Sequence, residues 1–220
     1  MTRAGWYPLA GAEDLADGHI VDAVLDGRPL AVWRGADRIA RAWENRCPHR
    51  GVRLSIGSVV GDELVCRYHG WRFAGADGRC TRVPAHPNSA PPSGLRIQAR
   101  PVREAAGIVW CDSGEGSEFV EPEPGIVARP LMFAMGLVAL RGAMLGALGG
   151  SSAIGEAWLR ASLPHEAGGW TVTLLLRPAG PHECWVHGLV HAGAPARPVA
   201  IARAQTDWLA GVRRLFENSL

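Results

Sequence analysis

Short apolar runs separated by turn residues dominate the first half of the sequence. The runs Ile20–Leu25, Leu30–Trp33 and Ile39–Trp43 are divided by Asp26-Gly27 and by Gly35-Ala36-Asp37. An Asp-Gly pair between two segments rich in β-branched and aromatic residues is a strong hairpin signal. The same pattern continues toward Cys111, with further runs at Val59-Val60, Leu64–Cys66 and Ile108–Cys111. We therefore expect a small antiparallel β-sandwich or barrel in this part of the chain.

The pattern changes after Cys111. The segment Ser113–Pro124 is acidic and rich in proline, which marks a domain boundary. We place a first domain at residues 1–118 and a second at residues 119–220. The expected fold is mainly β, with a β-sandwich or barrel domain followed by a small, reduced α+β module.

The second domain contains fewer clear signals. A hairpin-like pair and two short helices are expected, the pair at Trp170–Leu176 and Cys184–Val190 and the helices at Ser152–Ser162 and Ala202–Leu215. Within the apolar segment Ile126–Leu148, residues Leu131–Leu140 are apolar on every face of a helix, so they are expected to be buried.

Composition narrows the possible functions. The chain has 220 residues, of which 47% are hydrophobic, and a net charge of +2, so disorder is excluded. Basic and acidic residues are nearly equal in number, so a strongly basic surface that binds nucleic acid is not expected.

The sequence also bears on targeting. Trp6-Tyr7-Pro8 stands where a secretion signal would need an apolar run, and Leu131–Leu140 is shorter than the roughly 20 residues of a membrane-spanning helix. Five cysteines, an odd number, argue against a disulfide scaffold. We expect a cytoplasmic protein with no nucleic-acid or membrane partner.

The candidate metal ligands lie in two short loops. One is Cys47-Pro48-His49-Arg50-Gly51 and the other is Cys66-Arg67-Tyr68-His69-Gly70-Trp71, and each leads out of an expected strand. Two cysteines and two histidines brought together could bind zinc or a two-iron cluster with mixed ligands. Zinc sites more often pair Cys with Cys and His with His, so the mixed loops favour the cluster.

These loops, together with Trp6-Tyr7-Pro8 and Val83-Pro84, resemble those of the Rieske [2Fe–2S] family. The resemblance implies that Cys47 and Cys66 bind one iron of a [2Fe–2S] cluster and that His49 and His69 bind the other. Two neutral imidazoles in place of two thiolates remove negative charge, which raises the reduction potential.

The oxygenase branch of this family matches best. Respiratory-type Rieske proteins usually carry a disulfide between the two loops, and Val52 and Tyr68 stand at those positions here. Oxygenases of this branch, which include aromatic-ring dioxygenases and O-demethylases, join their Rieske domain to a larger catalytic domain. That domain holds a mononuclear iron through two histidines and one carboxylate.

The second iron site is harder to find in this sequence. The family spacing of two histidines is met by His182 and His187, but Ala179 occupies the position of the preceding polar residue and the segment is typical of a strand. We therefore expect no mononuclear Fe(II) in this chain. The full set of candidate ligands is His165, His182, His187, His191, Glu156, Glu166, Glu183 and Asp207.

Three functions remain open. The expected one is an electron-transfer subunit of a heteromeric Rieske non-haem iron oxygenase, an oxidoreductase component that is not catalytic alone. The resemblance implies a homologous catalytic subunit as acceptor, in a hetero-oligomer, and a reductase or ferredoxin as donor. The alternatives are a self-sufficient oxygenase with an atypical mononuclear iron site and a non-enzymatic, ferredoxin-like carrier.

Overall fold

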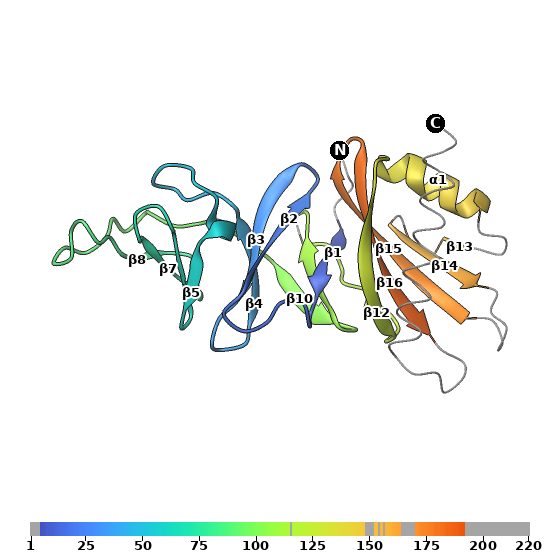
Figure 1. Cartoon of the computed structure of the whole chain (residues 1–220), viewed down its shortest axis with the longest axis horizontal. Helices are drawn as coiled ribbons and strands as arrows, with labels where there is room; N and C mark the ends of the chain where they lie inside the picture. Colours follow the sequence, from blue (N-terminus) through green and yellow to red (C-terminus); the bar gives the residue numbers. More distant parts are fainter. Residues whose placement is uncertain are drawn as a thin grey trace.

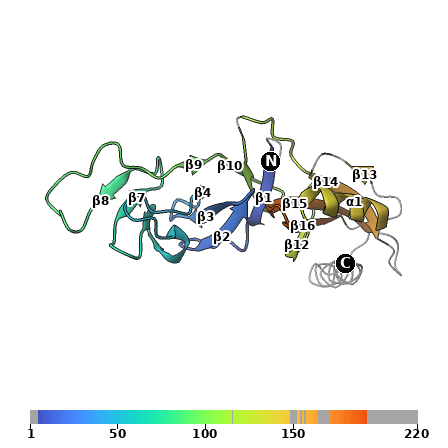
Figure 2. The ribbon, with the colours of Figure 1, turned by 90° about the horizontal axis from the view of Figure 1, so that it is seen from above.

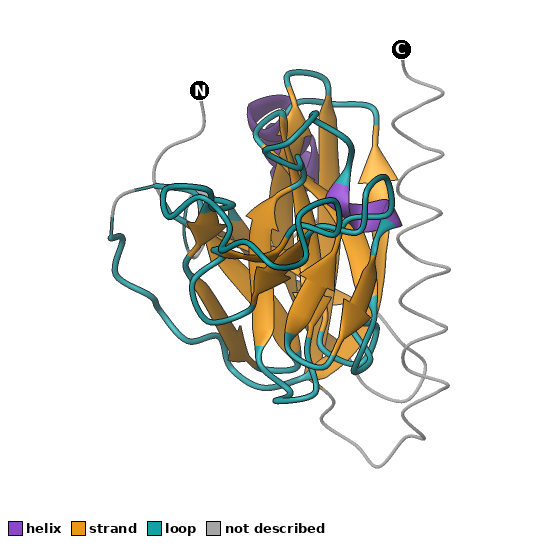
Figure 3. Ribbon diagram, turned by 90° about the vertical axis from the view of Figure 1, so that its left-hand side faces the viewer, coloured by secondary structure: helices purple, strands orange, loops and turns teal. Residues whose placement is uncertain are grey.

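The computed structural model describes residues 5–114, 116–147, 152–153, 155, 157–163 and 170–191. In this part of the chain the strands form four sheets, and every strand pairing is antiparallel. Figure 3 shows strands as the main element, with only short stretches of described helix. The expectation of a mainly β fold is confirmed.

The four sheets follow one another along the long axis of the molecule (Figure 1). At one end lies the tip sheet, formed by β5 (Ser58–Val60), β6 (Glu63–Val65), β7 (Arg72–Ala74) and β8 (Cys80–Arg82), with the short helix η1 (Leu54–Ile56) before it. Next comes the central sheet, formed by β2 (Ile20–Leu25), β3 (Arg28–Arg34), β4 (Ala40–Glu44) and β9 (Ala99–Arg100).

The two remaining sheets complete the molecule. The base sheet has the order β1-β11-β10, from β1 (Trp6–Gly11), β11 (Ile108–Asp112) and β10 (Val102–Ala105). The C-terminal sheet has the order β12-β16-β15-β14-β13, from β12 (Ile126–Phe133), β16 (Glu183–His191), β15 (Trp170–Gly180), β14 (Trp158–Leu163) and β13 (Ser152–Ala153). Helix α1 (Leu137–Ala147) packs beside it (Figure 2).

The central sheet is buried on both faces, which explains its continuous apolar run. On β3, Leu30 and Val32 enter one hydrophobic cluster, the base core, which also contains Tyr7 and Val109. Alternate residues of the same strand enter a second cluster, the tip core, which consists of Ala31, Trp33, Trp43, Cys47, Leu54, Leu64, Cys66, Phe73, Cys80, Val83 and Ile97. Side chains alternate between the faces of a strand, so one strand contributes to both cores.

The C-terminal sheet packs against the rest of the molecule. Leu175 of β15 and Leu189 of β16 are buried with Ile108 and Trp110 of β11. Main-chain bonds add to this contact, because the β2–β3 turn donates from its two backbone N–H groups, Asp26 N to Pro178 O and Gly27 N to Ala179 O, both at 2.8 Å. Both turn residues have positive φ, 50° and 74°, as a two-residue hairpin of this kind requires.

Two expectations for the second domain are wrong. The segment Ser152–Ser162 forms strands β13 and β14 rather than a helix, because β14 pairs along its length with β15. The segment Leu131–Leu140 is divided between the end of β12 and the start of α1, and Val138 is 84% exposed. The expected hairpin is confirmed as β15 and β16, and the helix expected at Ala202–Leu215 lies outside the described residues.

The connection between β11 and β12 contains the proposed boundary between residues 118 and 119, which stays a prediction. This connection is held to the N-terminal strand, since the indole N–H of Trp6 donates to Ser117 O at 2.9 Å and Trp6 packs edge-on against Phe119. Over the described residues, no helix combines the length and hydrophobicity needed to span a bilayer.

Candidate metal centre

The two cysteine–histidine loops have the same backbone structure. In the first, Cys47 N donates to Val52 O and Gly51 N donates to Cys47 O, both at 2.8 Å. In the second, Cys66 N donates to Trp71 O and Gly70 N donates to Cys66 O, both at 2.9 Å. The equal spacing of these bonds makes the loops structurally equivalent.

A glycine closes each loop for a conformational reason. Gly51 has φ of 72° and Gly70 has φ of 67°, in the left-handed region that residues with a Cβ rarely adopt. The first loop follows β4 and the second joins β6 to β7, so the tip sheet and the central sheet position one loop each.

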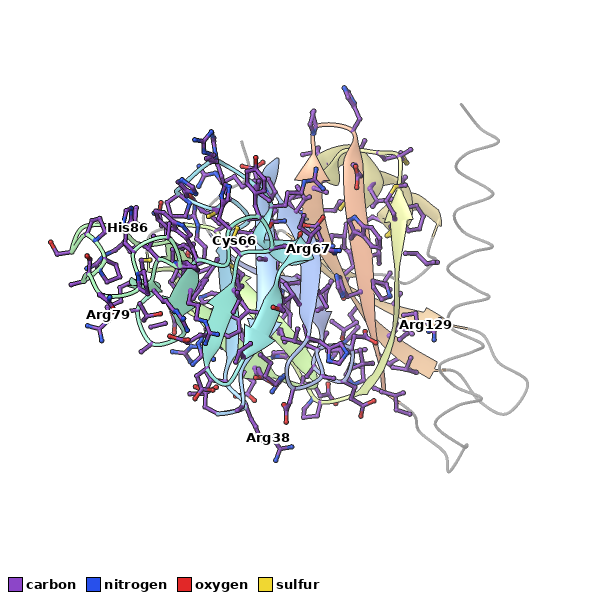
Figure 4. The ribbon with its side chains drawn as sticks, turned by 60° about the vertical axis from the view of Figure 1, so that its left-hand side comes forward. Arg38, Cys66, Arg67, Arg79, His86 and Arg129 are labelled. Carbon is purple, nitrogen blue, oxygen red and sulfur yellow. The ribbon has the colours of Figure 1, made fainter. Side chains whose placement is uncertain are left out.

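The loops bring the four predicted ligands together. Cys47 and Cys66 are 3% and 2% exposed, within the tip core, and their thiols interact with each other. His49 and His69 are exposed, and their Nδ1 atoms lie 3.1 Å apart. Figure 4 shows Cys66 at the end of the molecule that carries the tip sheet. Each of the two loops thus contributes one buried thiol and one exposed imidazole.

Before a metal binds, the site favours a protonated thiol and a neutral imidazole. Burial raises the pKa of the Cys47 thiol to about 11, and the neighbouring Cys66 thiol contributes to the rise. A cysteine that binds a metal ion does so as thiolate, so binding at this site releases protons. Desolvation, His69 and Arg50 lower the pKa of His49, which favours the neutral imidazole that binds metal ions.

Aromatic rings pack against both histidines. Trp71 stacks on His49 with ring centroids 4.3 Å apart and an interplanar angle of 7°. Tyr68, which is 58% exposed, packs on His69 with centroids 3.8 Å apart. These contacts restrict the rotation of both imidazoles, so the nitrogen atoms are held in place before any metal binds.

The donor set fits a two-iron cluster. Among the described residues, no three His, Cys, Asp or Glu side chains converge as ligands of one metal ion. A Rieske-type cluster does not require such a group, because each of its irons takes only two protein ligands. Two paired sulfurs and two paired nitrogens meet that requirement.

The candidate residues for a second iron are only partly described. His187 is 1% exposed and neither of its ring nitrogens has a hydrogen-bond partner, whereas His191 binds Thr173 Oγ1 at 2.9 Å and Pro124 O at 3.0 Å. His182 lies in the turn between β15 and β16, beside Glu183. The remaining candidates lie outside the described residues: His165, Glu156, Glu166 and Asp207. The absence of a mononuclear iron site therefore stays a prediction.

Arg46 was not predicted as a site residue from the sequence, but in the structure it contacts the first ligand loop. Its guanidinium lies over Gly51, with Nε 3.1 Å from the position that a Cβ of that residue would take. The only signal in the sequence is its place immediately before Cys47.

Comparison with known sequences agrees with the geometry. Residues 5–101 match the family model described as the Rieske [2Fe-2S] domain. The oxidoreductase NdmD of Pseudomonas putida is 46% identical over 110 residues, which cover 50% of this chain and 19% of that protein. The oxygenase component of dicamba O-demethylase from Stenotrophomonas maltophilia is 37% identical over 115 residues, which cover 52% of this chain and 33% of that protein. The matches thus span at most a third of these two relatives.

Comparison with solved structures extends the similarity of fold beyond the matched domain. A crystal structure of dicamba monooxygenase with non-haem iron and dicamba superposes with a TM-score of 0.71 and 21% sequence identity, and covers 86% of this chain and 76% of that one. The fold therefore resembles that structure in the C-terminal sheet as well as in the tip. Residues 5–101 of the chain therefore match the Rieske [2Fe–2S] domain, and the expected resemblance to the oxygenase branch of that family is confirmed by the sequence relatives.

Proposed function

We propose that this chain is the electron-transfer component of a Rieske non-haem iron oxygenase system. Cys47 and Cys66 would hold one iron of the cluster, and His49 and His69 the other. The observation that supports this proposal is the pair of equivalent loops, which place two buried thiols and two exposed imidazoles at one end of the molecule.

A [2Fe–2S] cluster bound by these residues supplies one-electron oxidation and reduction, at a potential raised by its two neutral ligands. The surrounding residues of the chain control water access and the orientation of the ligands. The tip core excludes water from Cys47 and Cys66, while the exposure of His49 and His69 gives a partner protein access to the imidazole edges. Trp71 and Tyr68 keep those edges in a fixed orientation.

The proposed electron acceptor is a homologous oxygenase subunit with a mononuclear iron, and the proposed donor is a reductase or ferredoxin. Two relatives named as oxygenase components of their systems support this arrangement, as does the relative named as an oxidoreductase. The five free cysteines fit a reducing compartment such as the cytoplasm.

A self-sufficient oxygenase is the second candidate, because the fold similarity to dicamba monooxygenase extends over 86% of the chain. Iron analysis separates the two functions. The electron-transfer component binds two irons per chain, and the self-sufficient enzyme binds three. A third iron that is retained, together with turnover by the isolated protein, would favour the second candidate.

The ligand assignment can be tested with matched cysteine variants. After anaerobic reconstitution, the wild-type protein should show a Rieske-type paramagnetic signal once reduced. Cys47→Ser should abolish the signal because it removes a thiolate ligand. Cys80→Ser, which changes another buried free cysteine of the tip core, should retain it. Equal loss of the signal in both variants would contradict the assignment.

A second test addresses the histidines. His69→Cys should lower the midpoint potential, because a thiolate adds negative charge to the site. A redox titration followed by visible absorbance measures the change. An unchanged potential with an intact cluster would refute the role of His69.

A further inference from the structure

The two ligand loops are fixed at their ends in different ways. The second loop leaves β6 and enters β7, and these two strands pair with each other, so Val65 lies opposite Arg72 at the ends of the loop. The first loop leaves β4 and enters η1, which belongs to none of the sheets in the described part of the chain. The ends of the first loop therefore depend on contacts other than a strand pairing.

A side chain joins the two ends of the first loop. Asn45 is the first residue after β4, two positions before Cys47, and it is 3% exposed. Its Oδ1 accepts a hydrogen bond from the backbone N–H of Ser55 at 2.8 Å, and its Nδ2 donates to Ser55 Oγ, also at 2.8 Å. One amide group thus connects the residue that precedes the loop with a residue of η1 that follows it.

The same amide also connects the loop to the central sheet. Asn45 Nδ2 donates its other hydrogen to Asp22 Oδ1 of β2 at 2.6 Å. Both hydrogens of the amide are donated and its oxygen accepts, so the amide has one orientation, because turning it round would set its NH₂ group against the N–H of Ser55. Arg53, the residue before η1, lies 3.6 Å from Asp22 as well. We name Asp22, Asn45 and Ser55 together the neck cluster.

We propose that Asn45 is a positioning residue for the redox centre, and that the neck cluster holds the first ligand loop, with Cys47 and His49, in a fixed place relative to the second loop. The inference rests on the proposed function, because it assumes that the loops hold that centre. Asn45 acts only through the residues it bonds to, and the ligands remain those already assigned.

The place of Asn45 in the fold explains how a residue outside the loop affects its ligands. The first loop comes from the central sheet and the second from the tip sheet, two separate layers in Figure 1. Ser55 belongs to η1, whose Leu54 is buried in the tip core together with Cys47 and Cys66. Asp22 belongs to the central sheet. Asn45 thus lies where the two layers meet, so a shift of the neck cluster moves one loop against the other.

The test reverses the hydrogen bond between positions 45 and 22. Asn45→Asp sets a carboxylate oxygen where the amide nitrogen now lies 2.6 Å from Asp22 Oδ1, so two acceptors face each other. Asn45→Asp/Asp22→Asn restores the bond with donor and acceptor exchanged, and the Ser55 hydroxyl donates where it now accepts. Asp22→Asn alone keeps an oxygen acceptor at position 22 and loses only the exposed ion pair with Arg53.

A matched control weakens the tip sheet without touching the neck cluster. Thr81→Val removes the hydrogen bond from Thr81 Oγ1 to Glu63 Oε1, also at 2.6 Å, which joins β8 to β6. Each protein is reconstituted anaerobically and its iron content is measured. Visible absorbance then follows the release of the cluster to a chelator, and electron paramagnetic resonance of the reduced protein records the width of the Rieske-type signal.

Asn45→Asp should release its cluster roughly 10-fold faster than the wild type, because each of the two lost hydrogen bonds contributes a factor of about 3 to 10. Its signal should also be broader, since a loop that is no longer fixed adopts a range of positions. The double variant should keep the wild-type line width and a release rate within about threefold of the wild type. Asp22→Asn and Thr81→Val should keep the wild-type line width.

Three results would overturn the inference. One is a wild-type release rate and line width in Asn45→Asp. Another is a double variant that behaves like Asn45→Asp, and the third is equal broadening in Thr81→Val. If Asn45→Asp binds no cluster, binding that returns in the double variant supports the inference, and binding that stays absent contradicts it. A wild-type protein without a Rieske-type signal would instead refute the proposed function itself.

Discussion

We expect His187 to make the folded protein less stable in mild acid. It lies on β16 opposite Leu175, is 1% exposed, and has no hydrogen-bond partner on either ring nitrogen. Burial, with a smaller contribution from the Arg177 guanidinium, lowers the pKa of His187 from 6.5 to about 3. The folded protein therefore keeps this imidazole neutral at pH values where the unfolded chain protonates it.

The loss of stability in acid can be calculated from the difference in proton binding between the folded and unfolded states. Between pH 6.5 and pH 3 the unfolded chain binds one more proton than the folded protein, so the contribution of His187 to stability is present above pH 6.5 and is lost as the pH falls. The slope is about 1.4 kcal/mol per pH unit. At pH 5 the free energy of unfolding should therefore be lower by about 2 kcal/mol on account of this residue alone.

Urea denaturation followed by tryptophan fluorescence at pH 7.5, 6.0 and 5.0 measures this contribution. His187→Leu removes the titrating group and both unpaired nitrogens, so it should be at least as stable as the wild type at pH 7.5. Its loss of stability on acidification should be smaller by about 2 kcal/mol at pH 5. His86→Leu, at an exposed loop position, should keep the wild-type pH profile. Parallel profiles for the wild type and His187→Leu would refute the reasoning.

Two further predictions concern the tip. Gly78→Ala should destabilise the protein by at least about 2 kcal/mol more than Gly61→Ala in the same denaturation assay. Both glycines have positive φ, but a Cβ at Gly78 would lie 2.5 Å from Ile97 O, whereas a Cβ at Gly61 would contact nothing within 4 Å. Trp71→Ala should shorten the lifetime of the cluster in the presence of a chelator, measured by the decay of visible absorbance, because it removes the ring stacked on His49. A stacked pair contributes about 0.5–1.5 kcal/mol, so Trp71→Phe should retain most of that lifetime, and equal decay of the two variants would contradict this role.

Local signals predicted the first domain well. The Asp26-Gly27 pair specifies its hairpin by backbone conformation alone, and β2 and β3 pair on either side of it as expected. The two ligand loops are equally local, since each is closed by bonds within six consecutive residues. For such features the sequence contains all the physical information that the chain uses.

The second domain depends on distant contacts, and prediction was poorer there. The alanine and leucine residues of Ser152–Ser162 favour a helix, but pairing with β15 overrides that propensity. A break at Gly136 separates β12 from α1, where a Cβ would clash with Pro181 O, on the β15–β16 turn.

The division of β3 between two cores has a consequence for the stability of the protein without metal. Both cysteine ligands proposed for the cluster belong to the tip core, and the base core contains neither of them. We therefore expect the packing of the base core to depend little on whether the loops hold a metal.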